Sequence, residues 1–438
     1  MAQSLAQYLP DWLAYLIAAL VHVMLLNVLV ATSALIFIWM ERKVSGRIQD
    51  RLGPTRVGGR YGWLQTLADG IKLLTKEDLM PGGADRLLFK LAPYVSMAAS
   101  LGAFMAIPFS VGAVVWAALH LNVAVFFVLA VLGLEVFGTI LAGYSSASKW
   151  SLFGAMREAA QVVSYEVPLG LCAVVPVLLA GTMDLAVIGS QQAGFFTSWY
   201  IFHDPFTFLV FWVYFTCATA SVNRAPFDLA EAESELVAGF HTEYSGFRWS
   251  VFFLAEYGSM LSVSLLASIL FLGGWNGPIP IFHWLGWSQL PGEAATVTGY
   301  LAALAGLLNL LFKGIVGVAV MMWVRWTLPR LRIDQVMTTC LKYCTPIAAV
   351  MFLGVVSWQL LLPGRTFFGI LPVREDYYAL QESWPGRDAL RVEVESEEDI
   401  VVQSPVAERA DVALRNAEFA AESNGPDEAA RAGEVAAR

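Results

Sequence analysis

Long apolar runs alternate with polar connecting segments along most of the chain. Eight runs are long enough to cross about 30 Å of hydrocarbon as helices. They lie near residues 16–40, 88–112, 121–143, 159–182, 205–222, 249–273, 298–324 and 342–362. The first run does not read as a cleaved signal, because no basic segment precedes it and it leads directly into Glu41-Arg42-Lys43. The pattern predicts an all-α polytopic membrane protein with about eight transmembrane helices within residues 1–372.

The segment 62–74 has a different pattern, with apolar residues at helical spacing among polar ones. Its apolar face consists of Trp63, Leu67, Ile71 and Leu74. Such a helix lies in the plane of the membrane interface. It either anchors the loop to the membrane surface or lines an opening for a lipid-soluble molecule, and the sequence leaves both alternatives open.

Composition agrees with a membrane protein and excludes other classes. Of the 438 residues, 57% are hydrophobic and only 14% are charged, whereas soluble proteins have about 25% charged residues. Residues 1–372 contain 20 Lys and Arg and 20 Asp and Glu, so the net charge of −9 belongs to residues 373–438. The neutral body excludes a basic nucleic-acid-binding face. We expect 373–438 to be an acidic tail that is disordered or loosely helical, because large apolar residues are scarce there.

Basic residues are concentrated on one side of the predicted helices. Eighteen of the 20 Lys and Arg before residue 373 lie in the connecting segments 41–90, 144–158, 223–248 and 325–342. The connecting segments of the other side contain none, namely 113–120, 183–204 and 274–297. The positive-inside rule places the charged loops in the cytoplasm, and the N-terminus and the tail outside.

The sequence carries no motif for a metal, a cluster or a nucleotide. The cysteines form no CxxC pair, the five histidines lack metal-ligand spacing, and neither GxGxxG nor GxxxxGK[ST] occurs. Cys340 and Cys344 share a helix face, as ordinary helix packing produces. We expect no metal, flavin or iron–sulfur cluster on this chain, and no catalytic residue of its own.

Several charged residues fall within the predicted membrane helices. They are Glu135, Glu166, Glu256 and Lys313, with Glu158 at the edge of a helix. An ionised group at the middle of a bilayer costs roughly 2.5–3.5 kcal/mol on insertion scales. These groups either form buried ion pairs or face a hydrated interior, where neighbouring carboxylates bind protons more tightly. The second alternative is a proton path.

A further set of acids follows Asn223-Arg224-Ala225-Pro226-Phe227. If this segment is helical, Glu231 and Glu235 meet at i,i+4, where like charges destabilise a helix. Local stability therefore does not explain them. The acids either favour a helix N-terminus through its dipole or form a protonatable funnel toward the membrane carboxylates.

Motifs over about residues 1–365 resemble one protein family. They include Glu41-Arg42-Lys43, Arg51-Leu52-Gly53-Pro54, Asp69-Gly70-Ile71-Lys72-Leu73-Leu74, Ser164-Tyr165-Glu166-Val167, Asn223-Arg224-Ala225-Pro226-Phe227-Asp228 and Glu243-Tyr244-Ser245-Gly246. Together they look like the H subunits of bacterial NADH:quinone oxidoreductase (respiratory complex I), the counterparts of mitochondrial subunit 1. This resemblance implies a subunit at the junction of the peripheral and membrane arms.

The resemblance also implies roles for individual residues. The membrane side of the quinone chamber would include Arg42, Arg47, Asp69, Phe253 and Arg325. Charge or protons would be carried by Tyr165, Glu166, Asp228, Glu231, Glu233, Glu235, Glu243 and Glu256, to which we add the intramembrane Glu135. The substrate would be a quinone, ubiquinone or menaquinone, while flavin and iron–sulfur clusters would belong to partner subunits.

The implied partners are the quinone-site subunits of the peripheral arm, small membrane subunits and membrane lipid, with no nucleic acid. The implied location is the bacterial cytoplasmic membrane. The sequence departs from the family pattern at Ser221, where many members have Glu, and Glu135 is a candidate to compensate. Leu341 replaces a common Trp, and the tail lies outside the pattern.

Two other functions compete with the complex I interpretation. One is the corresponding membrane subunit of an energy-converting hydrogenase or ferredoxin-linked complex, which needs no quinone entrance. The other is a free-standing proton or ion carrier, which the buried acids permit. The amphipathic segment favours quinone, and the large charged loops favour docking of soluble partners.

Overall fold

The computed structural model describes residues 10–112, 115–231, 233–285, 287 and 296–362. Regular structure in this part of the chain is helical, apart from one isolated bridge between Val111 and Val115. The prediction of an all-α polytopic membrane protein is confirmed by the length and apolar character of these helices. The predicted tail, 373–438, lies outside the described residues.

Seven helices of the described chain are long and apolar enough to cross a membrane. They are α2 (Asp11–Ile48), α4 (Arg86–Ala106), α5 (Ala124–Ser145), α6 (Lys149–Ala180), α10 (Gly246–Phe271), α12 (Val297–Thr327) and a continuous helix made of α13 (Ile333–Met337), η4 (Thr338–Cys344) and α14 (Thr345–Leu361). The remaining predicted span is α8 (Pro205–Ser221), an apolar helix of 17 residues, which is close to the lower limit for crossing a bilayer.

Two helix boundaries differ from the predicted ones for identifiable reasons. Helix α4 ends at Ala106 instead of continuing to residue 112, because Pro108 disfavours helical geometry at the residue before it. Helix α2 continues past residue 40 to Ile48, so Glu41 lies within the helix and is buried there. A buried carboxylate requires charged or hydrogen-bonding partners, and the site described below provides them.

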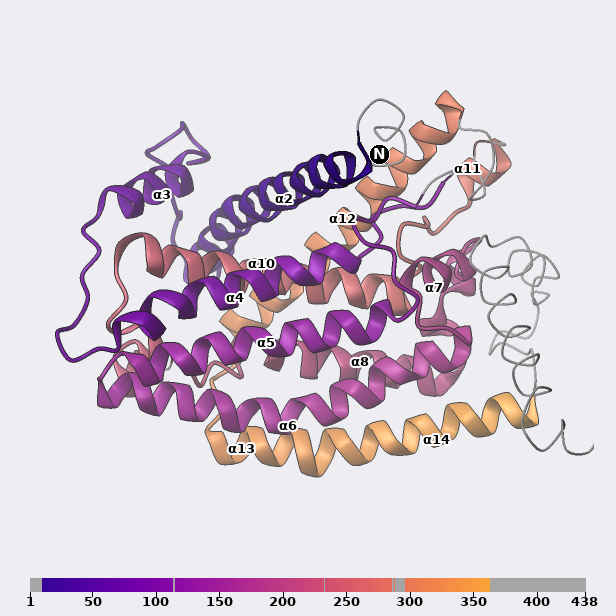
Figure 1. The fold of residues 1–438 in the computed structure, drawn as a ribbon. Helices are drawn as coiled ribbons and strands as arrows, with labels where there is room; N and C mark the ends of the chain where they lie inside the picture. The colour runs from indigo at the N-terminus through magenta and orange to yellow at the C-terminus, as the bar shows by residue number, and fades with distance from the viewer. Residues whose placement is uncertain (1–9, 113–114, 232, 286, 288–295, 363–438) are drawn as a thin grey trace, which may run out of the picture. The chain divides into compact units, whose positions relative to one another are not determined.

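The helices pack around α10, which is the most deeply buried of the long ones. In Figure 1, α4, α5 and α6 lie side by side, and α14 runs along α6. Helix α10 packs against α4, α12 and α2, and α8 packs between α6 and α14. Serines and small residues are frequent on the buried faces of α10, including Gly258, Ser259 and Ser262, which lets neighbouring helices approach closely.

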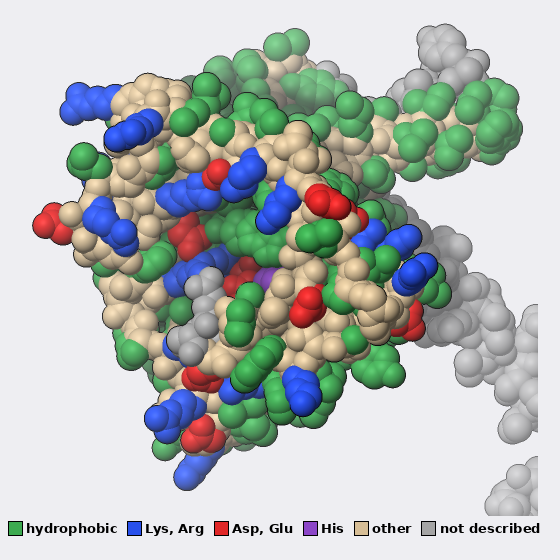
Figure 2. Space-filling view, turned by 90° about the vertical axis from the view of Figure 1, so that its left-hand side faces the viewer, with side chains coloured by type: hydrophobic (Ala, Val, Ile, Leu, Met, Phe, Trp, Pro, Cys, Tyr) green, Lys and Arg blue, Asp and Glu red, His purple; other side chains and the backbone are tan. Residues whose placement is uncertain are grey.

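The predicted amphipathic segment forms helix α3 (Gln65–Thr75), which begins three residues later than expected. Gly62 adopts a positive φ of 68° before the helix, and the ring of Trp63 stacks on Trp39 of α2 at 4.3 Å. Leu67 and Ile71 of its apolar face are exposed. Figure 2 shows that Lys, Arg, Asp and Glu side chains gather on the face of the molecule seen from the α3 side.

Shorter helices occupy the connecting segments. They are α7 (Leu185–Gln191), η1 (Phe196–Ser198), η2 (Tyr200–Phe202), α9 (Glu233–Leu236), η3 (Gly239–His241) and α11 (Ile281–Trp284). The intramembrane Lys313 of α12 reaches one of these connections, just after α10. Its ammonium donates hydrogen bonds to the carbonyls of Leu272 (2.6 Å), Gly274 (2.9 Å) and Asn276 (2.7 Å), and it lies 4.3 Å from the ring centre of Trp199.

Candidate functional site

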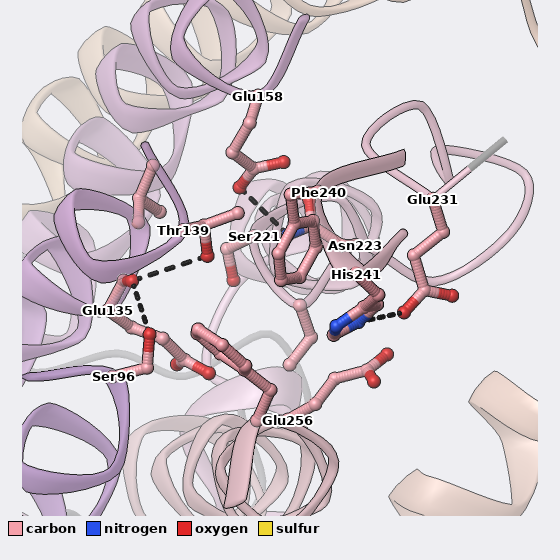
Figure 3. Close-up of a pocket in the computed structure, with 13 residues that line it drawn as sticks. Ser96, Glu135, Thr139, Glu158, Ser221, Asn223, Glu231, Phe240, His241 and Glu256 are labelled. Carbon is pink, nitrogen blue, oxygen red and sulfur yellow. Dashed lines mark hydrogen bonds and ion pairs between the residues drawn. The ribbon is translucent and has the colours of Figure 1, made fainter. Parts of the chain in front are cut away.

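A cavity of about 30 Å³ lies where α5, α6 and α10 meet the segment that follows α8. Four acids line it, namely Glu135, Glu158, Glu231 and Glu256. Its other polar lining residues are Ser96, Thr139, Ser221, Asn223 and His241 (Figure 3). This volume is large enough for one or two water molecules. We refer to it as the acid cavity.

The segment after α8 reaches the cavity through turns and not through one long helix. Asn223 has a positive φ of 51°, which Asn tolerates better than most residues, and Gly239 has a positive φ of 54°. A Cβ at Gly239 would collide with the carbonyl oxygen of Ala230. The sequence places Glu231 and Glu235 at i,i+4 only if the segment is helical, and in the described residues the α-helix here is α9 (Glu233–Leu236), which Glu231 precedes.

Within this segment, Glu231 forms an ion pair with His241, with 3.0 Å between Oε1 and Nε2. A carboxylate only accepts hydrogen bonds, so Nε2 donates. Nδ1 is buried and has no hydrogen-bond partner among the described residues. Burial acts to raise the pKa of Glu231, but the hydrogen bond from His241 and the charge of Arg224 outweigh it and lower this pKa.

Asp228 precedes this pair in the same segment. Burial raises its pKa from 3.8 to about 6, and the nearby charge of Glu231 acts in the same direction. The charges of Arg325 and Arg224 offset part of the increase. Its Oδ1 is buried without a hydrogen-bond partner in the described chain.

Glu135 of α5 lies at the opposite side of the cavity. Its carboxylate accepts a hydrogen bond from the hydroxyl of Ser259 on α10. Its backbone carbonyl accepts one from Ser96 of α4 at 3.1 Å, shown in Figure 3. These serines belong to α4 and α10, so hydroxyl groups of two other helices hold Glu135.

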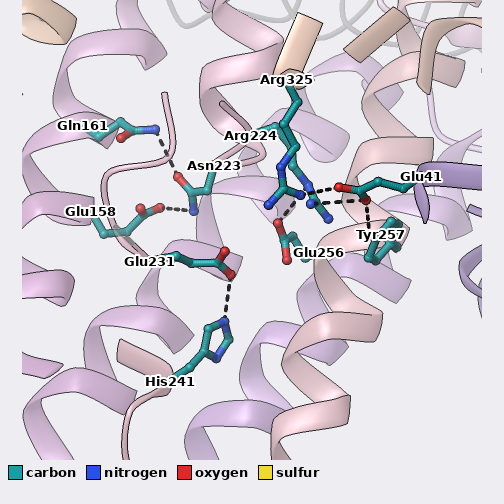
Figure 4. Close-up of polar contacts among 10 residues, drawn as sticks. All are labelled: Glu41, Glu158, Gln161, Asn223, Arg224, Glu231, His241, Glu256, Tyr257 and Arg325. Carbon is teal, nitrogen blue, oxygen red and sulfur yellow. Dashed lines mark hydrogen bonds and ion pairs between the residues drawn. The ribbon is translucent and has the colours of Figure 1, made fainter. Parts of the chain in front are cut away.

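Glu256 connects the cavity to a second group of charges, which we call the arginine network. In this network Arg224 pairs with Glu256 (Nε to Oε1, 2.9 Å) and with Glu41 of α2 (3.7 Å). Arg325 of α12 pairs with Glu41 at 2.6 Å, and the hydroxyl of Tyr257 donates to Glu41 (Figure 4). Arg224 is only 2% exposed, so its two ion pairs are shielded from water.

The residues predicted for a quinone chamber lie beside this network. Arg42, one residue after Glu41, forms an ion pair with Asp69 of α3. Burial acts to raise the pKa of Asp69, but the hydrogen bond from Arg42 outweighs it and lowers this pKa. Phe253 stacks on Trp249 at 4.8 Å on the first turns of α10. Arg47 is exposed on the last turn of α2 and forms no ion pair with the other predicted chamber residues.

Other predicted proton-path residues lie outside the cavity lining. Tyr165 is buried in α6, whereas Glu166 is exposed on the same helix. Glu235 is also exposed and pairs with Arg157 (2.6 Å) and Arg330 (2.9 Å). Glu243 is half-buried, and the side chain of Glu233 lies outside the described part. The structure thus brings Glu135, Glu231 and Glu256 together and sets the others apart.

Sequence reasoning does not assign His241, Glu158 or Asn223 to the site. From sequence, Glu158 is an acid at a helix edge, but it is completely buried inside α6. Asn223 is only part of a motif, and His241 is a single histidine with no spacing signal. The network residues Glu41 and Arg224 belong to the family motifs without an assigned role. For Glu41 the sequence offers one signal, because an acid that directly follows a long apolar run lies at the end of a membrane helix.

Comparison with known proteins gives a consistent result. A model of the NADH dehydrogenase family matches residues 21–356. The H subunit of NADH-quinone oxidoreductase from Anaeromyxobacter dehalogenans is 44% identical over 325 residues, which are 74% of this chain and 78% of that protein. The H subunit from Chlorobium luteolum is 44% identical over 342 residues, 77% of this chain and 88% of that protein.

A third relative extends the match further along its own length. One NADH-quinone oxidoreductase H subunit of Cytophaga hutchinsonii, numbered 2 in its name, is 43% identical over 358 residues, which cover 75% of this chain and 95% of that protein. The family match reaches all of the long described helices. The chain therefore belongs to the family of NADH-quinone oxidoreductase H subunits, the subunit 1 family of respiratory complex I.

Proposed function

We propose that this chain forms the membrane side of the quinone-binding chamber and links quinone reduction to proton translocation through its buried carboxylates. One observation carries the proposal: Glu256 belongs both to the acid cavity and to the arginine network. Charged groups therefore follow one another from the end of α2 to the buried acids. The protein is a multi-pass membrane subunit of an oxidoreductase complex, and the proposal assigns the work of this chain within it.

The network side would bind the quinone. Arg42 and Asp69 join α2 to the amphipathic helix α3, whose exposed apolar residues suit an entrance for a lipid-soluble molecule. Phe253 and Trp249 add stacked aromatic rings on α10. Reduction of a quinone requires protons as well as electrons, so it changes the charge balance next to Arg42 and Arg325.

The cavity side would receive that change and move protons. Glu41 and Glu256 both pair with Arg224, so a shift of Arg224 toward one acid leaves the other less compensated. A buried carboxylate that loses its cation binds a proton more tightly. In this way a change at the quinone would alter proton binding at Glu256, and then at Glu135 and Glu231. Asp228, Glu243, Glu233 and Glu235 would supply protons from the surface of the loop.

The exposed Glu166 fits assembly with other subunits. Its side chain is exposed near the middle of α6, a membrane-spanning helix. Contact of this carboxylate with lipid would be costly. We infer that a neighbouring membrane subunit covers Glu166, with buried Tyr165 beside it. The charged face that carries α3 would bind the quinone-site subunits of the peripheral arm and lie in the cytoplasm, with both termini outside.

The test is the substitution Glu256→Gln in the assembled complex. Gln keeps the size of the side chain but neither pairs with Arg224 as an anion nor carries a proton. We expect NADH:quinone activity and proton pumping to fall at least about tenfold, as removal of a proton-transfer group commonly does. NADH oxidation by ferricyanide, which bypasses the quinone, should stay unchanged.

Asp334→Asn is the matched control, because Asp334 is an exposed acid of α13 that belongs to none of the proposed sites. Its complex should retain both activities. If Glu256→Gln gave wild-type quinone activity and wild-type pumping, the proposed link between the arginine network and the acid cavity would be refuted.

A further inference from the structure

We propose that Glu158 of α6 is a further proton-carrying residue of the acid cavity, placed between the Glu231–His241 pair and Glu135. This inference rests on the proposed function, and it adds a residue that the family motifs quoted above do not include. It depends on three observations, namely the burial of Glu158, the asymmetric hydrogen bonding of its two oxygens and the cavity that they line.

The side chain of Glu158 is 0% exposed, although it is an acid inside a membrane-spanning helix. Its Oε1 accepts a hydrogen bond of 2.8 Å from Nδ2 of Asn223. Its Oε2 is buried and has no hydrogen-bond partner among the described residues. A buried carboxylate with one oxygen left unpaired is costly unless it binds a proton or a water molecule.

The orientation of the Asn223 amide is fixed by a second amide. Nε2 of Gln161 donates to the carbonyl of Ala220 (2.8 Å) and to Oδ1 of Asn223 (3.0 Å). A carbonyl oxygen only accepts, so the nitrogen of Gln161 must face it, and Asn223 must present its oxygen to Gln161. Asn223 is left with its nitrogen toward Glu158, as Figure 4 shows. Oε1 is thereby committed as an acceptor, and a proton is bound at Oε2.

The unpaired Oε2 has a counterpart on the other wall of the acid cavity. Nδ1 of His241 is also buried and unpartnered within the described chain, and both residues line the same space of about 30 Å³. One or two water molecules there would connect these two atoms. A proton leaves one of them, is carried by water and binds to the other, so that only O–H and N–H bonds break and form. Glu135 lines the same space and is the next acceptor.

A purely structural role for Glu158 would consist of holding Asn223 through Oε1. The substitution Glu158→Gln keeps that role, because the Gln carbonyl also accepts from Asn223, but it removes the acid. We expect pumping and NADH:quinone activity of the assembled complex to fall at least about tenfold. The ferricyanide activity should be unchanged, which shows that the complex is assembled and that its electron-input arm works.

An infrared difference spectrum on quinone reduction supplies a readout that a structural role would not move. A protonated Glu158 contributes a carboxyl band, and this band should be absent in the Glu158→Gln complex and retained in Glu158→Asp. The variant Glu158→Asp keeps an acid and should retain most of the pumping. If Glu158→Gln prevents assembly, the variant Glu158→Asp decides alone. Loss of its pumping, while its carboxyl band stays as in the wild type, would overturn the proposal.

A second substitution tests whether the acid must stand at position 158 or only within the acid cavity. Ser221 lines the same cavity from the end of α8, and its hydroxyl donates to the carbonyl of Ala218 at 2.9 Å. We expect Ser221→Asp to restore at least about a third of the pumping lost in Glu158→Gln, since it returns an acid to the cavity. Asp334→Asn remains the control with wild-type activity.

The outcomes separate this inference from the proposed function. Wild-type pumping in Glu158→Gln together with a loss in Glu256→Gln would overturn the role of Glu158 alone. Wild-type pumping in both would overturn the proposed function as well. Failure of Ser221→Asp to restore any pumping, in a complex that is assembled, would show that an acid in the cavity does not carry the proton and would overturn the route through the acid cavity.

Discussion

Two regions of this protein place charge inside membrane-spanning helices, and they differ in whether their polar atoms have hydrogen-bond partners. The ammonium of Lys313 donates to three backbone carbonyls at the end of α10 and faces the ring of Trp199. In the acid cavity, Oε2 of Glu158 and Nδ1 of His241 lack hydrogen-bond partners within the described residues. In the first region every donor of the ammonium has an acceptor. In the second region, buried polar atoms without a partner border a space for water.

This difference shows that charge in the membrane is a weak guide to function when taken alone. An ammonium has three donors, and three carbonyls satisfy them, so Lys313 has a fixed structural partner for each proton. A carboxylate with a free oxygen beside a cavity exchanges its partner easily. We therefore propose a stabilising role for Lys313, in contrast to the proton movement proposed for the cavity acids. Substitutions in each region test this contrast.

The largest effect expected is on stability, from Lys313→Met. Met fills about the same volume but leaves the carbonyls of Leu272 and Gly274 without this donor, at about 1–3 kcal/mol for each buried group, while the carbonyl of Asn276 keeps the hydrogen bond from Asn309. The thermal midpoint of the complex should fall by several degrees, as followed by loss of quinone activity on heating. The complex that remains assembled should pump a wild-type number of protons per NADH.

Lys90→Met is the matched control, because Lys90 is an exposed lysine of α4. Its thermal midpoint should stay at the wild-type value. A Lys313→Met complex of normal stability that failed to pump would break the comparison, since it would place Lys313 in the proton path with the acids.

The helices of both regions were predictable from sequence, but the partners of the charges were not. Apolar runs are a local property, so each of the eight predicted spans falls on a helix of the structure. The partners of Lys313 are backbone carbonyls, which every residue carries, so no side-chain pattern marks them. The sequence identified Lys313 and the acids as one class, and only geometry separates them.

The acid cavity illustrates the same limit in another way. The family resemblance singled out Asp228 and Glu231, but the sequence left open whether they approach the membrane acids or favour a helix N-terminus. The pairing of Glu231 with His241 depends on the turn at Gly239, whose backbone lies too close to Ala230 for any side chain. A turn of this kind is set by contacts between distant segments, and no local sequence pattern predicts it.

A smaller, pH-dependent effect is expected at Asp228. Its folded-state pKa of about 6 lies above the ordinary 3.8, so the folded protein holds this proton more tightly than the unfolded chain does. The site therefore loses stability as pH rises from about 4 to about 6 and stays less stable above that range. Asp228→Asn removes the titration. The thermal midpoint of the variant should rise relative to wild type between pH 5 and pH 7.

The control for this change is Asp50→Asn, at an exposed acid that follows α2. Its thermal midpoint should differ from wild type by the same amount at both pH values. A difference for Asp228→Asn that is equal at pH 5 and pH 7, or that falls with pH, would contradict the raised pKa. It would then place Asp228 with the fully paired groups and not with the cavity acids.

The smallest effect is expected from Glu235→Gln, which compares a surface acid with the buried ones of the same loop. Glu235 is exposed and pairs with Arg157 and Arg330, and the hydrogen bond from Arg157 holds its pKa below the ordinary value. Exposed ion pairs contribute at most about 1 kcal/mol, and water replaces an exposed proton donor readily. Pumping should fall by no more than about twofold, and the difference should shrink at high salt as the pairs are screened. A loss as large as that of Glu158→Gln would mean that Glu235 is an obligatory step of proton entry, because water would not replace it.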